Sequence, residues 1–150
     1  MAVRKIVYDT DSLIRKQSKE VTEFDERLHQ ILDDMWDTVI KAQGAGLAGV
    51  QVGILRRIFI VMTDTLEKEF INPVILEKRG SQKGAEGCLS VPRRQGEVER
   101  PNFVKIKAQD RFGKEFTITA KGFDARAICH EYDHLDGKLY IDIADEVYNI

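Results

Sequence analysis

The segment DARAICHEYDHL, residues 124–135, decides how the rest of this 150-residue sequence is interpreted. It carries an H-E-x-x-H pattern at residues 130–134 and is predicted to form a helix. Residues four apart lie on the same face of a helix, so His130 and His134 can both bind one metal ion. Glu131, next to the first histidine, can accept a hydrogen bond from a water on that ion and act as its base. The alternative is a surface helix with two solvated histidines.

A catalytic ion in such a site usually has three protein ligands and one open position, so a third ligand is needed. Acidic residues that follow the helix are one source: Asp136, Asp142, Asp145 and Glu146. Cys88 is the better candidate, because it follows a glycine in the segment GAEGCLS, residues 84–90, which is predicted to be a loop between strands. A lone cysteine is more often a small buried hydrophobic residue, but a nearby two-histidine site favours a metal ligand.

The glycine-rich segment GAGLAGVQ, residues 44–51, is the third feature with chemical interest. It does not match the phosphate-binding patterns G-x-G-x-x-G or G-x-x-x-x-G-K-[ST]. The simpler alternative is the end of a helix followed by a loop. Its unobstructed backbone amides and the side chain of Gln51 are suited to lining a narrow polar cleft and binding an oxyanion.

Two helices are predicted, one in each half of the chain. An apolar stripe with i, i+3, i+4 spacing over residues 25–42 indicates an N-terminal amphipathic helix. Thr22, with Asp25 three residues later, is expected to cap its start, and Gly44 lies just past its end. The second helix, which carries HEYDH, is expected to stop near Gly137.

Four strands are predicted from short runs rich in isoleucine, valine and phenylalanine: residues 57–62, 70–76, 103–108 and 116–120. Turn residues at 110–114 predict that the last two strands form a hairpin. The expected class is therefore α+β, with mostly antiparallel sheet around a central metal-binding helix and residues 1–150 forming a single domain.

Composition excludes several classes of function. With 43% hydrophobic and 32% charged residues, a packed domain is expected. The 23 basic and 25 acidic residues give a net charge of −2, so no field attracts nucleic acid or anionic lipid. No apolar run reaches the roughly 20 residues of a membrane span, and no signal peptide is evident, so a cytoplasmic location is expected. Cys88 and Cys129 are expected to be reduced there.

The three segments GAGLAGVQ, EGCLS and HEYDH, in this order, resemble the peptide deformylase family. The resemblance spans residues 5–143 and implies a metal-dependent hydrolase that removes the formyl group from the initiator methionine of new polypeptides. It implies iron(II) as the usual ion. The implied partners are N-formyl-methionyl nascent chains, met transiently at the ribosome, and a monomer is the default expectation.

The resemblance also assigns roles to individual residues. The three metal ligands would be Cys88, His130 and His134. Glu131 would be the catalytic acid and base, while Gln51 and the backbone N–H of Leu89 would stabilise the oxyanion. Four small residues would line the substrate cleft: Gly44, Ala45, Gly46 and Gly87. Four positions depart from common family residues without touching a proposed ligand: Gly49, Val50, Gln95 and Cys129.

The chemistry of the residues agrees with these roles. A thiolate makes the site a softer Lewis acid that fits iron(II), nickel, cobalt or zinc. Glu86 is expected either to anchor the cysteine segment, with Arg100 as its partner, or to be a solvated charge. Two other functions stay open from the sequence. One is a small zinc endopeptidase with an acidic ligand from the C-terminal segment, and the other is a metal-stabilised binding module that docks on the ribosome without turnover.

Overall fold

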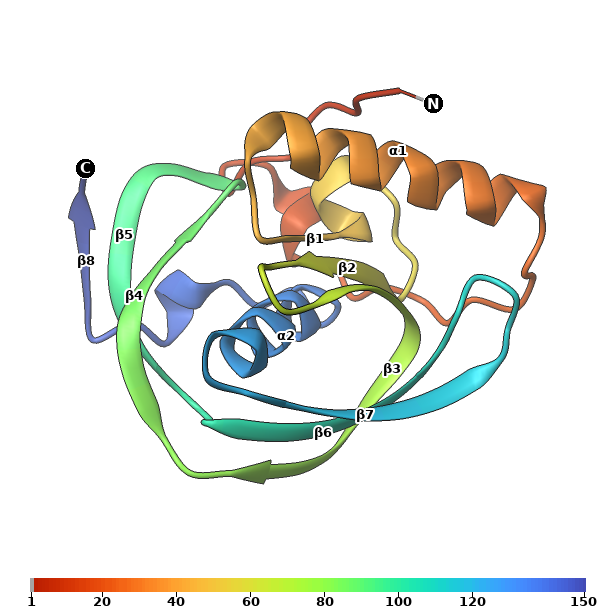
Figure 1. Cartoon of the computed structure of the whole chain (residues 1–150). Coiled ribbons are helices and arrows are strands. Elements are labelled where there is room, and N and C mark those ends of the chain that lie inside the picture. The colour runs from red at the N-terminus through yellow and green to blue at the C-terminus, as the bar shows by residue number, and fades with distance from the viewer. Residues whose placement is uncertain (1) are drawn as a thin grey trace.

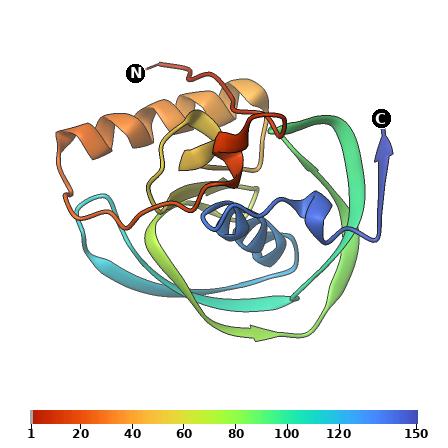
Figure 2. The same ribbon diagram turned by 180° about the vertical axis from the view of Figure 1, so that it is seen from behind.

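Helix α2 (Gly122–His134) lies at the centre of the computed structural model, which describes residues 2–150, and strands surround it (Figures 1 and 2). Most of its side chains are buried, polar ones included, because it contacts strands on several sides. The helix ends at His134, and Gly137 follows with φ of +73°. A Cβ atom at Gly137 would lie 2.1 Å from the carbonyl oxygen of Arg15, so this turn requires glycine. The predicted stop near this residue is confirmed.

Helix α1 (Glu26–Ala42) confirms the predicted amphipathic helix, but the residue that caps its start differs from the expectation. The Asp25 carboxylate accepts a hydrogen bond from the Leu28 N–H at 3.1 Å, so Asp25 caps the helix and Thr22 does not. At the other end, Gln43 adopts the left-handed conformation with φ of 56°, and Gly44 follows just past the helix, as expected. The short polar side chain of aspartate suits it to capping, whereas the C-terminal turn is held by backbone bonds from Gln43.

Five antiparallel strands form one sheet in the order β1-β2-β3-β6-β7. Their bounds are Gly46–Ala48, Ile58–Met62, Glu67–Arg79, Phe103–Gln109 and Glu115–Lys121. The four predicted strands are thus confirmed, although β3 is longer than its apolar run. The β6–β7 hairpin is confirmed too: the Asp110 carboxylate accepts from the N–H groups of Phe112 and Lys114. Strand β1 lies inside the glycine-rich segment 44–51, for which the end of a helix followed by a loop was the simpler alternative.

A second, three-stranded sheet, β4-β5-β8, was not predicted. Its strands are Gln82–Cys88, Val91–Arg100 and Glu146–Asn149. The expectation that Cys88 lies in a loop is therefore wrong, since it is the last residue of β4. The sequence signal is weak because charged side chains and glycines dominate these strands, and only alternate residues of β5, such as Val98, are buried.

Strand β2 separates the two parts of the hydrophobic core. Ile58 and Ile60 pack with the apolar face of α1, while Phe59 and Val61 pack with the cluster around α2. This alternation follows from the two-residue period of a strand. Within the described residues there are also three short 3-10 helices: η1 (Ser12–Arg15), η2 (Gly49–Val52) and η3 (Tyr140–Asp142). No helix among residues 2–150 is long and apolar enough to cross a membrane.

The expected class, α+β with antiparallel sheet around the HEYDH helix, is confirmed. The arrangement places the end of β4, the segment β1-η2 and the buried face of α2 together. Those are the three segments that the sequence singled out, and residues of all three line one cleft.

Candidate active site

His130 and His134 lie on one buried face of α2, as the four-residue spacing predicted. Their ring centroids are 5.1 Å apart. Cys88 Sγ lies 3.4 Å from Nε2 of His134, and one donor atom from each of these three residues lies within 4.8 Å of the others. Among residues 2–150, this is the group of histidine, cysteine and acidic side chains close enough to hold a metal ion. A thiol and two imidazoles are a donor set that transition metals accept.

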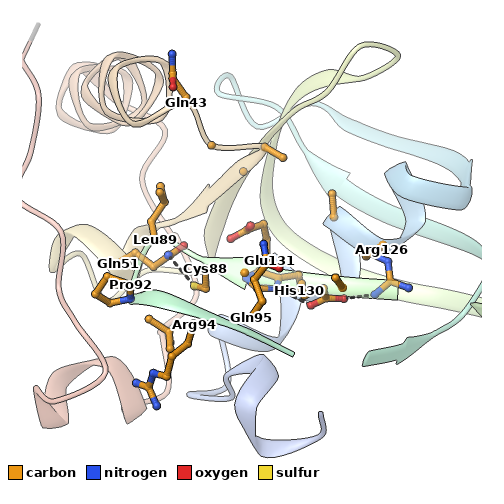
Figure 3. A pocket seen from close by; sticks show the side chains of 18 of the residues that line it. Gln43, Gln51, Cys88, Leu89, Pro92, Arg94, Gln95, Arg126, His130 and Glu131 are labelled. Atoms are coloured by element: carbon orange, nitrogen blue, oxygen red, sulfur yellow. Dashed lines mark hydrogen bonds and ion pairs between the residues drawn. The ribbon is translucent and has the colours of Figure 1, made fainter. Parts of the chain in front are cut away.

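Glu86 orients the first histidine. Its Oε1 lies 2.8 Å from Nδ1 of His130, and because a carboxylate only accepts, Nδ1 carries the proton and Nε2 is left for the metal site. Glu86 itself is 6% exposed, and two guanidinium groups bind it, those of Arg100 at 2.9 and 3.0 Å and Arg126 at 2.6 Å. Figure 3 shows the Arg126 side of this network.

The charge state of Glu86 follows from these contacts. Burial alone would raise its pKa, but hydrogen bonds from His130 and Arg100 outweigh burial and hold the pKa well below its usual value. The expected pairing of Glu86 with Arg100 is confirmed. The role of Arg126 was not foreseen, because a helical arginine one turn before His130 carries no sequence signal that it is buried.

Glu131 points into the site from the same helix (Figure 3). It is 5% exposed, and no described group bonds its Oε1 atom. Burial raises the pKa of this carboxyl to about 7. Its Oε2 atom lies 2.7 Å from the place that a Cβ atom on Gly46 would occupy, so a side chain at this position of β1 would displace the carboxylate. A buried carboxyl with a free oxygen beside a metal-ligand cluster can exchange a proton there.

Gln51 faces Cys88 from η2. Its Oε1 accepts from the Ala48 N–H at 2.9 Å, which fixes the direction of the side-chain amide. Its Nε2 therefore points at the site, 3.1 Å from Ser90 Oγ and 3.5 Å from Cys88 Sγ (Figure 3). The contribution of Ser90, which is fully buried, was missed, although it stands two residues after the cysteine.

These groups line a cleft of about 530 Å³. Nine of the ten predicted site residues lie in its wall: Gly44, Ala45, Gly46, Gln51, Gly87, Cys88, Leu89, His130 and Glu131. The tenth, His134, is 1% exposed and lies behind the wall, in contact with Cys88. Several other wall residues were missed, among them Gln43, Arg93, Arg94, Phe123 and Ile150. Most of these lie one or a few residues from a motif, but nothing in their type marks them.

The acidic residues after α2 do not join the cluster. Asp136 pairs with Arg57 at 3.0 Å, and Asp142 pairs with Arg15 at 2.6 Å. The other two, Asp145 and Glu146, lie beyond η3, where Asp145 is 3.4 Å from Lys83 and Glu146 begins the exposed strand β8. The endopeptidase alternative, which needs a ligand from this segment, has no support from the geometry.

Comparisons with known proteins agree with this geometry. The family model described as polypeptide deformylase matches residues 3–149. A peptide deformylase from Caldicellulosiruptor bescii is 54% identical over 95% of this chain and 86% of its own length, and peptide deformylase 1 from Bacillus subtilis is 45% identical over 99% and 94%.

Solved structures give the same result. The crystal structure of peptide deformylase from Thermotoga maritima superposes with a TM-score of 0.94 at 37% identity, covering 97% of this chain and all of that one. One from Legionella pneumophila has a TM-score of 0.92 at 41% identity, with coverage of 96% and 87%. The chain therefore belongs to the polypeptide deformylase family, metal-dependent hydrolases that remove the formyl group from the amino terminus of new polypeptides.

Proposed function

We propose that this chain hydrolyses the N-formyl group of the initiator methionine, using one divalent transition-metal ion held by Cys88, His130 and His134. The observation that carries the proposal is the convergence of these three side chains, within 4.8 Å, beside the buried carboxyl of Glu131. The products are formate and a peptide with a free amino terminus.

The three donors fit such an ion. Glu86 binds Nδ1 of His130 and leaves Nε2 available, and Cys88 already lies against Nε2 of His134. One thiolate with two imidazoles suits iron(II), nickel, cobalt or zinc, and the family resemblance favours iron(II). When bound, an ion of this kind acts as a Lewis acid and lowers the pKa of water.

The side chains and backbone of the protein carry out proton transfer and oxyanion binding. Glu131 takes a proton from the attacking water and passes it to the departing methionine nitrogen. The side-chain amide of Gln51, held in direction by the Ala48 N–H, donates to the oxyanion that forms on the formyl oxygen. We assign the same role to the backbone N–H of Leu89, which follows Cys88 in the cleft wall.

Small residues explain the choice of a formyl group. We assign substrate binding to four small residues of the cleft wall: Gly44, Ala45, Gly46 and Gly87. There is little room beside them, since a Cβ atom on Gly46 would lie 2.7 Å from Oε2 of Glu131. A formyl carbon carries only hydrogen, so it can enter where an acetyl methyl group would collide. Because the substrates are nascent chains, we also propose that the protein acts in the cytoplasm, as a monomer that reaches its substrates transiently at the ribosome.

The test compares two cysteine variants. Cys88→Ala should lose the bound ion and formate release from N-formyl-Met-Ala-Ser, whereas Cys129→Ala, which removes a buried cysteine outside the cleft wall, should keep both. Metal content by elemental analysis and formate release are measured on protein purified without oxygen. The parent should release formate much faster than it releases acetate from N-acetyl-Met-Ala-Ser. Full metal content in Cys88→Ala, or comparable acetate release by the parent, would overturn the proposal.

A further inference from the structure

Three arginines line the cleft, and they differ in their partners. The guanidinium of Arg94 pairs with Asp9, and Figure 3 shows this side chain directed away from Cys88. Arg126 is buried and pairs with Glu86. Arg93 is exposed, and no carboxylate within residues 2–150 pairs with it. Its charge is therefore available to a ligand.

The backbone of Arg93 is unusual as well. Its φ of 63° lies in the left-handed region, which disfavours residues with a Cβ atom. The backbone is nevertheless fixed: the Arg93 carbonyl accepts from the Ile150 N–H at 3.0 Å, and the next residue begins the ladder between β5 and β8. Strain of this kind persists where surrounding structure enforces it, and it is found preferentially at functional sites.

No exposed acidic side chain in the described cleft wall competes with a ligand for the charge of Arg93. Of the described residues that line the cleft, only Glu86 and Glu131 are acidic, and both are buried. Glu86 is already neutralised by Arg100 and Arg126. An acidic group that enters from solvent therefore meets an unpaired guanidinium group at the rim of the cleft and no exposed acidic side chain in the described wall.

The position of Arg93 on β5 indicates which part of a substrate it would meet. Val91 pairs with Cys88 in the β4–β5 ladder, and Arg93 follows two residues later, in the irregular stretch between this pair and the next one, Glu86 with Gly96. Two residues span at most roughly 7 Å, and an extended peptide advances by roughly 3.3 Å per residue. A peptide that has its first residue at Cys88 and extends along β5 therefore brings its second or third residue level with Arg93.

From these observations we infer that Arg93 is a specificity-determining residue, which binds the carboxylate of an aspartate or glutamate at the second or third position of a formyl-methionyl peptide. This inference rests on the proposed function of the cleft. Since the pair is exposed to solvent, the preference over the uncharged amide should be modest, roughly two- to fivefold in kcat/KM, and should arise in KM.

The test uses four peptides: N-formyl-Met-Glu-Ala-Ser, N-formyl-Met-Ala-Glu-Ser and the two matching glutamine peptides. The metal-loaded parent is compared with Arg93→Gln and with Arg27→Gln, which removes an exposed arginine from α1, outside the cleft wall. The parent and Arg27→Gln should prefer glutamate at one of the two positions. Arg93→Gln should lose the preference, and about 0.5 M salt should weaken it in the parent.

Each other result has a distinct meaning. Formate release with equal rates for glutamate and glutamine peptides in the parent would overturn the inference and leave the proposed function intact. A preference that survives in Arg93→Gln would also overturn it, because another cation would then be responsible. If none of the four peptides released formate, the proposed function would fail first, and the inference with it.

Discussion

The carboxylate of Glu131 fills the space that a side chain on Gly46 would need, since its Oε2 lies 2.7 Å from an ideal Cβ position and its Cδ lies 3.0 Å away. Strand β1 and helix α2 are thus in contact where Gly46, which has no side chain, lies against the buried carboxyl group of Glu131. The glycine is a requirement of the site more than of the strand, because Gly46 has no left-handed backbone angle. The first prediction follows from this contact.

Gly46→Ala should displace the Glu131 carboxylate and lower turnover by about tenfold or more, because a misplaced proton carrier is costly even when it is present. Metal content should not change, since no ligand moves. Turnover is measured with N-formyl-Met-Ala-Ser in the metal-loaded proteins. The same change made on top of Glu131→Gln should have little further effect, and a full additional loss there would show that Gly46 acts independently of Glu131.

Glu131→Gln should retain the ion and lose on the order of a hundredfold or more in kcat, as the removal of a general base usually does. The amide has the same shape as the carboxylate but cannot accept and return the proton. Elemental analysis and steady-state kinetics of the same preparation check both parts. Turnover close to that of the parent in the metal-loaded variant would mean that a different group carries the proton.

Arg93→Gly should stabilise the fold while it removes the proposed substrate contact. Relief of the left-handed strain is worth about 1–2 kcal/mol, and the extra freedom of glycine in the unfolded chain offsets about 0.5–1 kcal/mol of that. A net gain of about 0.5–1 kcal/mol in the free energy of unfolding is expected from urea titration. Arg93→Ala is the control: it removes the same charge but keeps the strain, so it should show no such gain.

The ion pair between Arg15 and Asp142 should make stability depend on pH. The hydrogen bond from Arg15 lowers the pKa of Asp142 in the folded protein. A lowered folded pKa means that the contribution is complete above the unfolded value of about 3.9 and is lost as the pH falls through the folded value. Both side chains are more than a third exposed, so solvent screening keeps the effect below about 1 kcal/mol.

The corresponding measurement compares the parent with Asp142→Asn, whose amide oxygen can still accept from the Leu139 N–H. The parent should be the more stable protein at pH 7, and the difference in the free energy of unfolding should shrink below about pH 4. A difference that stays constant between pH 7 and pH 3 would show that the charge of Asp142 does not contribute.

The sequence predicted those features that follow directly from local residue spacing or residue type. The four-residue spacing of His130 and His134 places both on one helix face, and the isoleucine and valine runs of β2 and β6 indicate strands because such residues pack on a pleated surface. Composition was silent about β4 and β5. Most of their charged side chains are exposed, while Glu86 and Arg100 are buried as an ion pair, and pairing between the two strands, not residue preference, makes them strands.

The residues around the site could not be predicted either, because they are held by contacts between residues far apart in the sequence. Arg126 and Glu86 are 40 residues apart, and Gln51 and Ser90 are 39 apart. Neither pair has a local pattern that a sequence could reveal. The acidic residues after α2 had the right chemistry for metal ligands, but their arginine and lysine partners lie elsewhere in the fold.

The buried carboxylate of Glu86 couples the local unfolding of three elements. It joins β4 to β5 through Arg100 and to α2 through Arg126 and His130. Any local unfolding that separated these three elements would leave a carboxylate and two guanidinium groups unpaired in a partly dry interior, at a free energy close to that of global unfolding. Their amide protons should therefore exchange with solvent as one cooperative unit. The part of the cleft wall that β4, β5 and α2 form should therefore keep its shape when a ligand binds, because deforming it would separate the same charged groups.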